Sequence, residues 1–151
     1  MSEINIRFAN LFDHSEVLKL CAKWFEELSI DGFPSVCPHS GVWLADLIAN
    51  HLVFVGELGT KIIGVIGLRV GNMPWNNIEK VLFNDIFMTD IDHRNSGIAT
   101  MLLAVVKRFA SDQQMTLIMG HMTGTNAELK DRYLQIEGFK YGGGNFIYKG
   151  E

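Results

Sequence analysis

Apolar side chains recur with a helical period in several segments of the chain. Between positions 13 and 28 they fall at i, i+3, i+4, i+7 and i+11, the spacing of one helix face. Asp13 followed three residues later by Glu16 is typical of a capping box and predicts where this helix begins. Gly138 predicts the end of the last helix. The predicted helices cover residues 13–28, 41–49, 98–109 and 126–136.

Alternating or continuous apolar runs predict the strands. Gly59 and Thr60 separate two such runs and predict a hairpin. The run at 80–91 is too apolar for an edge strand, and the helix after it predicts a parallel partner. Residues 29–41 and 71–77 are predicted as loops because they are rich in Gly, Pro and polar residues. The predicted strands cover 4–9, 51–58, 61–70, 80–91 and 115–123, with one or two short strands in 139–149.

The resulting order is β-α-α-β-β-β-α-β-α-β, which predicts an α/β fold with helices on both faces of one mixed, partly parallel sheet. With 151 residues, residues 1–151 are predicted to form a single domain. The net charge of −4 argues against nucleic-acid binding, which depends on Lys and Arg contacts to phosphates. Cys21 lies on the apolar helix face and is expected to be a core residue. We find no signal peptide and no apolar run of about 20 residues, so we expect a cytoplasmic protein without membrane contact.

The stretch "HRNSGIATMLL" at 93–103 carries the candidate chemistry. It places a basic residue and a glycine directly before a strong helix. The first turn of a helix has unpaired N–H groups and the positive end of the helix dipole, so it binds phosphate. Gly97 allows close approach of an anion, and Arg94 can add a charged fork. The stretch therefore has the parts of a pyrophosphate site, although the motif Arg-x-x-Gly-x-Ala alone is weak.

Three segments in this order resemble the GNAT superfamily of N-acetyltransferases. "VGELGTKIIGVIGLRV" is similar to the central hairpin of that family, and "DIFMTDIDHRNSGIATMLL" is similar to its acyl-CoA-binding strand, loop and helix. "NAELKDRYLQIEGFKYGG" resembles its C-terminal signature. The resemblance covers nearly the whole chain and implies a sheet that splays between the fourth and fifth strands.

The resemblance implies acetyl-CoA as co-substrate, bound without a metal. The pantetheine arm would lie along the backbone of the fourth strand, where one N–H would polarise the thioester carbonyl. An amine would then attack directly, in a ternary complex. Asn126 of the C-terminal signature is assigned to the coenzyme site as well. The implied coenzyme residues are Phe87, Met88, Thr89, Arg94, Asn95, Ser96, Gly97, Ile98, Ala99, Thr100 and Asn126.

Two proton-transfer roles remain to be assigned. The family often uses a Tyr of the last helix to protonate the CoA thiolate; counting from Asn126 selects Tyr133, whereas counting back from Gly138 selects Leu134. We favour Tyr133, and the alternative is a Tyr packed at the helix–sheet boundary. Asp85 is the best candidate for the general base because its strand phase matches that of Phe87. The alternative for Asp85 is a solvated carboxylate at a strand bulge, or one paired with a Lys.

Glu79 and His121 are weaker candidates for the base, and Trp24 and Trp43 are expected in the core. The prediction is an acetyl-CoA-dependent N-acetyltransferase acting on a small-molecule amine or on a protein lysine or N-terminus. The alternative is a catalytically weak or inactive CoA-binding module. Acceptor specificity is expected in the loops 29–41 and 71–79, and a homodimer is possible by analogy.

Overall fold

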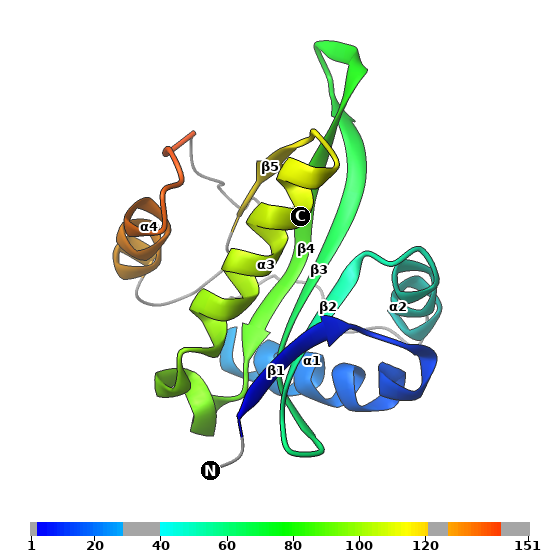
Figure 1. Cartoon of the computed structure of the whole chain (residues 1–151), viewed down its shortest axis with the longest axis vertical. Helices are drawn as coiled ribbons and strands as arrows, with labels where there is room; N and C mark the ends of the chain where they lie inside the picture. Colours follow the sequence, from blue (N-terminus) through cyan, green and yellow to red (C-terminus); the bar gives the residue numbers. More distant parts are fainter. Residues whose placement is uncertain (1–2, 29–39, 121–126, 143–151) are drawn as a thin grey trace, which may run out of the picture.

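The computed structural model describes residues 3–28, 40–120 and 127–142. Five strands form one sheet in the order of the chain (Figure 1). The first four pair antiparallel, and the last two pair parallel through three residues each, from Val81 opposite Thr116 to Phe83 opposite Ile118. This confirms the predicted mixed sheet. The strands are β1 (Ile4–Phe8), β2 (Val53–Leu58), β3 (Lys61–Met73), β4 (Asn76–Thr89) and β5 (Thr116–Ile118).

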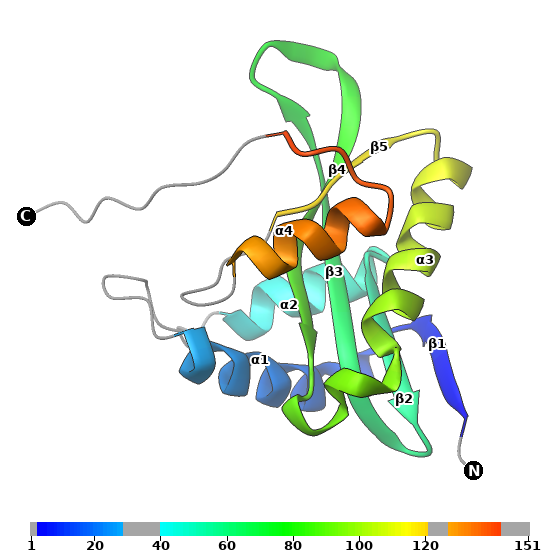
Figure 2. The same ribbon diagram turned by 90° about the vertical axis from the view of Figure 1, so that its left-hand side faces the viewer.

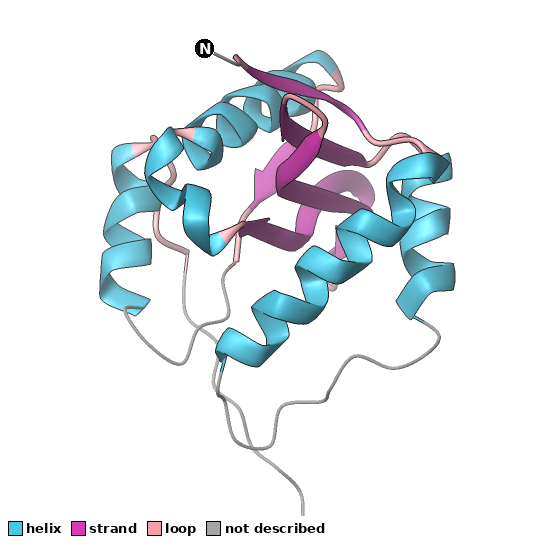
Figure 3. Cartoon of the chain, turned by 90° about the horizontal axis from the view of Figure 1, so that it is seen from below, coloured by secondary structure: helices cyan, strands magenta, loops and turns pink. Residues whose placement is uncertain are grey.

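Helices cover both faces of the sheet, as predicted (Figure 3). The pairs α1–α2 and α3–α4 each bury their apolar stripes in a separate core, one on each side of the strands (Figure 2). Cys21 is buried in the first core, which confirms its predicted place, but Trp43 is 38% exposed and is not a core residue. None of the helices in the described ranges is long and apolar enough to cross a membrane. The α-helices are α1 (His14–Leu28), α2 (Ser40–Ala49), α3 (Ile98–Asp112) and α4 (Ala127–Ile136); two 3-10 helices are η1 (Leu11–Asp13) and η2 (Ile91–Ser96).

The first helix begins differently from the prediction. The capping box is formed by Asn10 and Asp13 around η1, and α1 follows directly. Glu16, the predicted second member of the box, instead accepts a hydrogen bond from the backbone N–H of Ile62 at 3.0 Å. Asp13 is buried because Arg7 donates two hydrogen bonds to its carboxylate, at 2.7 and 2.9 Å. The sequence pattern S/T/D/N-x-x-E/D occurs twice in overlapping register here, and burial of Asp13 selects the earlier one.

Arg7 also binds the carboxylate of Glu57 on β2, at 2.8 Å. The guanidinium therefore lowers the pKa of both carboxyl groups that it contacts, Asp13 and Glu57. This ion triad ties β1 to β2 and to the start of α1.

The predicted loop at 71–77 is wrong. β3 and β4 continue through it, up to the pair Met73–Asn76, so that only Pro74 and Trp75 form the turn. The hairpin extends well beyond the rest of the protein (Figure 1), and Trp75 is 79% exposed at its tip. The prediction failed because Gly and Asn usually interrupt strands, whereas here Asn72 donates a side-chain hydrogen bond across the hairpin to the carbonyl of Glu79.

The last part of the chain departs from the prediction as well. Within the predicted strand 115–123, β5 covers Thr116–Ile118, residues 115, 119 and 120 are not in a strand, and residues 121–123 lie outside the described residues. Residues 139–142 contain no strand. Residues 29–39 of the predicted loop 29–41 and the predicted strand residues 143–149 lie outside the described residues, whereas Ser40 and Gly41 belong to α2 and not to a loop. α4 ends before Gly138, which has a φ of 92°, so the predicted C-terminal glycine is confirmed.

Candidate active site

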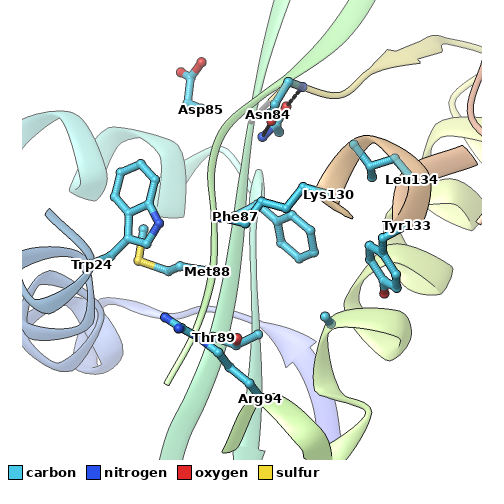
Figure 4. Close-up of a pocket in the computed structure, with 12 residues that line it drawn as sticks. Trp24, Asn84, Asp85, Phe87, Met88, Thr89, Arg94, Lys130, Tyr133 and Leu134 are labelled. Atoms are coloured by element: carbon cyan, nitrogen blue, oxygen red, sulfur yellow. Dashed lines mark hydrogen bonds between the residues drawn. The ribbon is translucent and has the colours of Figure 1, made fainter. Parts of the chain in front are cut away.

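A cleft of about 390 Å³ opens where β4 and β5 diverge. Its residues follow β4 from Thr89 and Arg94 at one end to Asn84 at the other, with α1 on one side and α4 on the opposite side (Figure 4). Most of the lining is apolar or aromatic, as in small-molecule sites. The lining residues are Trp24, Asn84, Asp85, Phe87, Met88, Thr89, Arg94, Ala99, Gly120, Lys130, Tyr133 and Leu134.

One end of the cleft is bounded by the glycine loop, residues 94–99. Gly97 has a φ of 84° and links η2 to α3, and a Cβ added there would meet nothing within 4 Å. The first hydrogen bond of α3 runs from the N–H of Met101 to the carbonyl of Gly97, so the N–H groups of Ile98, Ala99 and Thr100 have no partner within the helix. Three predicted phosphate-site residues, Asn95, Ser96 and Gly97, are exposed. The loop therefore has the open N–H groups and backbone conformation that an anion site requires.

The side chain of Ile98 anchors this loop to the sheet. Ile98 is fully buried and projects against Gly56 of β2 and Gly64 of β3. A Cβ on Gly56 would lie 2.0 Å from Cδ1 of Ile98, and one on Gly64 would lie 2.8 Å from its Cγ1. Two strand glycines thus leave the space that lets the first turn of α3 approach the sheet. Only the backbone of Ile98 can face a ligand.

The guanidinium of Arg94 forms an ion pair with the carboxylate of Glu27 near the end of α1. Lys130 of α4 extends across the cleft toward Phe87 (Figure 4). Burial lowers the pKa of Lys130, the positive charge of Arg94 lowers it further, and Glu27 raises it. These three charged groups therefore act on one another across the mouth of the cleft. Sequence reasoning missed Glu27 because it belongs to no motif, and missed Lys130 because only Asn126, Tyr133 and Leu134 of the C-terminal signature were considered for the site.

The predicted β4 residues point to opposite sides of the strand. Met88 is buried in the core under α1 and α2, whereas Phe87 packs toward α3 and α4 (Figure 4). Both line the cleft, together with Thr89. Trp24 of α1 was expected only in the core, but it also lines the cleft opposite α4.

Asp85 lies in a β-bulge. Gly67 and Leu68 are neighbours on β3, but their partners on β4 are Ile86 and Asn84, which leaves Asp85 as the extra residue. The bulge turns Asp85 to the α1 side of the strand, away from Phe87 (Figure 4). The prediction that the two share a phase is therefore wrong. Asp85 accepts a hydrogen bond from Nε of Arg69 at 3.1 Å. Of the alternatives given for Asp85, the strand bulge is confirmed, whereas its ion-pair partner is an Arg and not the expected Lys.

Tyr133 and Leu134 of α4 both line the cleft, so the two register alternatives are neighbours at one site. The hydroxyl of Tyr133 forms a 2.9 Å hydrogen bond with Oγ1 of Thr100 in the first turn of α3. Burial raises the pKa of Tyr133, and the bond to Thr100 offsets part of this rise. The residue directly after α4, Glu137, is also joined to α3, because Lys107 donates to its carbonyl at 2.8 Å.

The remaining candidates fall elsewhere. Glu79 lies on the hairpin, where its carboxylate accepts from Asn76 at 3.1 Å, and it does not line the cleft. His121 and Asn126 lie outside the described residues. Within the described ranges, no three His, Cys, Asp or Glu side chains gather as a possible metal ligand set.

Comparison with known proteins gives one family-model match and many structures that share this fold. The model of the Acetyltransferase (GNAT) family matches residues 21–139. A ribosomal-protein-alanine N-acetyltransferase from Brucella melitensis biovar Abortus 2308 superimposes with a TM-score of 0.73 at 16% identity, covering 99% of both chains. A predicted acetyltransferase from Clostridium acetobutylicum, solved with acetyl-CoA, has a TM-score of 0.73 at 17% identity and covers 97% of this chain and 96% of that one.

An aminoglycoside antibiotic 6'-N-acetyltransferase from Acinetobacter baumannii has a TM-score of 0.70 at 17% identity, covering 99% of both chains. At these identities the structural likeness shows a shared fold. Comparison with curated protein sequences gives no significant match.

Proposed function

The chain belongs to the acetyltransferase (GNAT) family, and on that premise we propose that it transfers an acetyl group from acetyl-CoA to a primary amine. The observation that carries the proposal is the exposed glycine loop opening into an apolar cleft along β4. A coenzyme with an anionic bridge and a long, uncharged arm matches both parts.

The proposed coenzyme site uses the chain from the loop inward. The pyrophosphate is held by the N–H groups of residues 97–100, and Arg94 exchanges Glu27 for a phosphate oxygen. The arm lies along β4 at Phe87 and Thr89 and directs the thioester toward the bulge at Asp85. A backbone N–H of β4 donates to the thioester oxygen as negative charge develops there.

In the proposed reaction the amine nitrogen attacks the thioester carbonyl carbon. A C–N bond forms, the C–S bond breaks, and the products are an amide and CoA thiol. Tyr133 donates its hydroxyl proton to the departing thiolate; the raised pKa of Tyr133 keeps the hydroxyl protonated at neutral pH. Asp85, oriented by Arg69, receives the proton of the amine through water. Alignment of the two reactants supplies most of the rate.

The acceptor enters from the α1 side, where Trp24 and Asp85 line the cleft. The structural neighbours include enzymes named for an aminoglycoside and for the alanine of a ribosomal protein. A small-molecule amine and a protein N-terminus are both within this proposal.

Calorimetric titration with acetyl-CoA tests the coenzyme site. Gly97→Glu places a carboxylate in the proposed phosphate position and should abolish binding. Gly59→Glu is the matched control, because Gly59 also has a positive φ, of 64°, and open space for a side chain, but lies on the β2–β3 turn. Both variants bear a similar backbone cost, about 1–2 kcal/mol. Equal binding by both variants, or no binding by the wild-type protein at high micromolar coenzyme, contradicts the proposal.

A thiol-release assay over a panel of amines then separates an enzyme from an inactive CoA-binding module. Release of CoA with any acceptor supports the enzyme. Tight binding of acetyl-CoA without release, across small amines and peptides with free N-termini, supports the module.

A further inference from the structure

The pairing of β4 with β5 ends in an unusual way. The last backbone pair is Phe83 with Ile118, and the strands separate beyond it. The side chain of Asn84 then bridges the gap: its Nδ2 donates to the carbonyl of Gly120 at 2.9 Å, and its Oδ1 accepts from the N–H of Gly120 at 2.6 Å. One side-chain amide thus takes the place of a strand residue and satisfies both backbone groups of Gly120.

This pair of hydrogen bonds lies at the far end of the cleft. Asn84 lines the cleft at the end opposite Arg94 and Thr89 (Figure 4), and Gly120, which it bonds, lines the cleft as well. A coenzyme anchored at the glycine loop and extended along β4 has its acyl group at its inner end. The acyl chain therefore points toward the Asn84–Gly120 pair.

Asn84 is held on two sides, so the end of the cleft has a fixed width. Its backbone is fixed by pairing with Leu68 and by the bulge at the next residue, Asp85, which Arg69 binds. Its amide is fixed by the two bonds to Gly120. A longer acyl chain has to displace this amide and break both of its hydrogen bonds to Gly120.

We propose that Asn84 is a specificity-determining residue that restricts the acyl donor to acetyl-CoA by closing the cleft against longer acyl chains. The inference rests on the proposed function. According to this inference, Asn84 determines which acyl-CoA is accepted. The glycine loop cannot do so, because every acyl-CoA carries the same pyrophosphate.

The test is a calorimetric series with CoA, acetyl-CoA, propionyl-CoA and butyryl-CoA. For the wild-type protein we expect the Kd of butyryl-CoA to exceed that of acetyl-CoA at least about tenfold, the discrimination that a tight pocket achieves against added methylenes. Asn84→Ala should reduce this ratio to within about twofold, while CoA itself binds as before. Asn72→Ala is the matched control: it removes another β-hairpin Asn that bonds a backbone carbonyl, at 2.9 Å to Glu79, outside the cleft.

The outcomes are distinct. A ratio that falls in Asn84→Ala and stays in Asn72→Ala supports the proposal; an unchanged ratio in Asn84→Ala overturns it. Should Asn84→Ala not fold, Asn84→Ser removes the same pair of hydrogen bonds to Gly120 with a smaller loss of side-chain volume, and the same criterion applies. Wild-type protein that binds butyryl-CoA as tightly as acetyl-CoA overturns the inference alone. Wild-type protein that binds none of the four ligands overturns the proposed function and the inference with it.

Discussion

Substituting Gly56 by Ala tests whether the sheet positions the glycine loop through Ile98. The added Cβ would lie 2.0 Å from Cδ1 of Ile98, 3.1 Å from its Cγ1 and 2.9 Å from Cδ1 of Ile6. Overpacking of this kind costs about 1–3 kcal/mol. The lower entropy of the unfolded Ala chain offsets about 0.4–1 kcal/mol of that cost, since Gly56 needs no left-handed backbone. The net loss in free energy of unfolding is therefore about 1–2 kcal/mol.

Urea denaturation at neutral pH measures this loss. The same variant should weaken acetyl-CoA binding, because relief of the clash moves Ile98 and with it the first turn of α3. Ile98→Val removes the clashing Cδ1; alone it should cost about 0.5–1.5 kcal/mol, but in the Gly56→Ala background it should cost nothing or restore stability. The reasoning would be refuted if the loss of unfolding free energy in the double variant equalled the sum of the two single losses to within about 0.5 kcal/mol, because residues in contact are expected to couple.

Three further predictions concern charges and protons. Glu27→Gln removes the carboxylate that competes with the proposed phosphate for Arg94. It should lower the Kd of CoA about two- to fivefold at low salt, the range of an exposed ion pair, without changing the Kd of pantetheine. Glu26→Gln is the control, and equal CoA affinity of both variants contradicts the competition. Tyr133→Phe should lower the rate of thiol release about 10²- to 10⁴-fold with little change in acetyl-CoA affinity, and an unchanged rate would assign the proton to water. The two carboxyl groups that Arg7 binds, Asp13 and Glu57, have lowered pKa values in the folded protein. The folded state is therefore stabilised by them above about pH 4–5, near their unfolded pKa values, and loses this stabilisation as the pH falls further. Arg7→Gln should cost about 1–3 kcal/mol of unfolding free energy at pH 7 and should flatten the decline of the urea midpoint between pH 6 and 3, whereas parallel declines of variant and wild type would argue against the triad.

The sequence predicts those parts of the fold that a local pattern determines. The helical period of α1 and α3, the turn at Gly59 and the end of α4 before Gly138 depend on neighbouring residues alone, and all are confirmed. The length of the β3–β4 hairpin was missed because its strands are held together by cross-strand contacts such as Asn72 with Glu79. Such contacts leave no periodic signal in the chain.

The candidate site shows the same division. The motif around Gly97 identified the loop correctly as a helix start with an open backbone. The predicted side of the strand for the Asp85 side chain was wrong, because a single bulged residue reverses the alternation of side chains and leaves no marker in the hydrophobic pattern. Asn84 and Lys130 line the cleft from β4 and α4, and Glu27 of α1 pairs with Arg94 of the cleft; only the folded chain brings these three elements together.

The attachment of α4 to α3 has a consequence for the motions of the protein. The hydroxyl of Tyr133 forms a hydrogen bond with Thr100, and Lys107 donates one to the carbonyl of Glu137, so the proposed proton donor is joined to the helix whose first turn is the proposed phosphate site. Thermal bending of the sheet changes the distance from this helix pair to β4 but leaves the spacing between donor and phosphate anchor unchanged. In the proposed reaction, the approach of this helix pair as a unit to β4 would then bring the proton donor and the phosphate site to the thioester together.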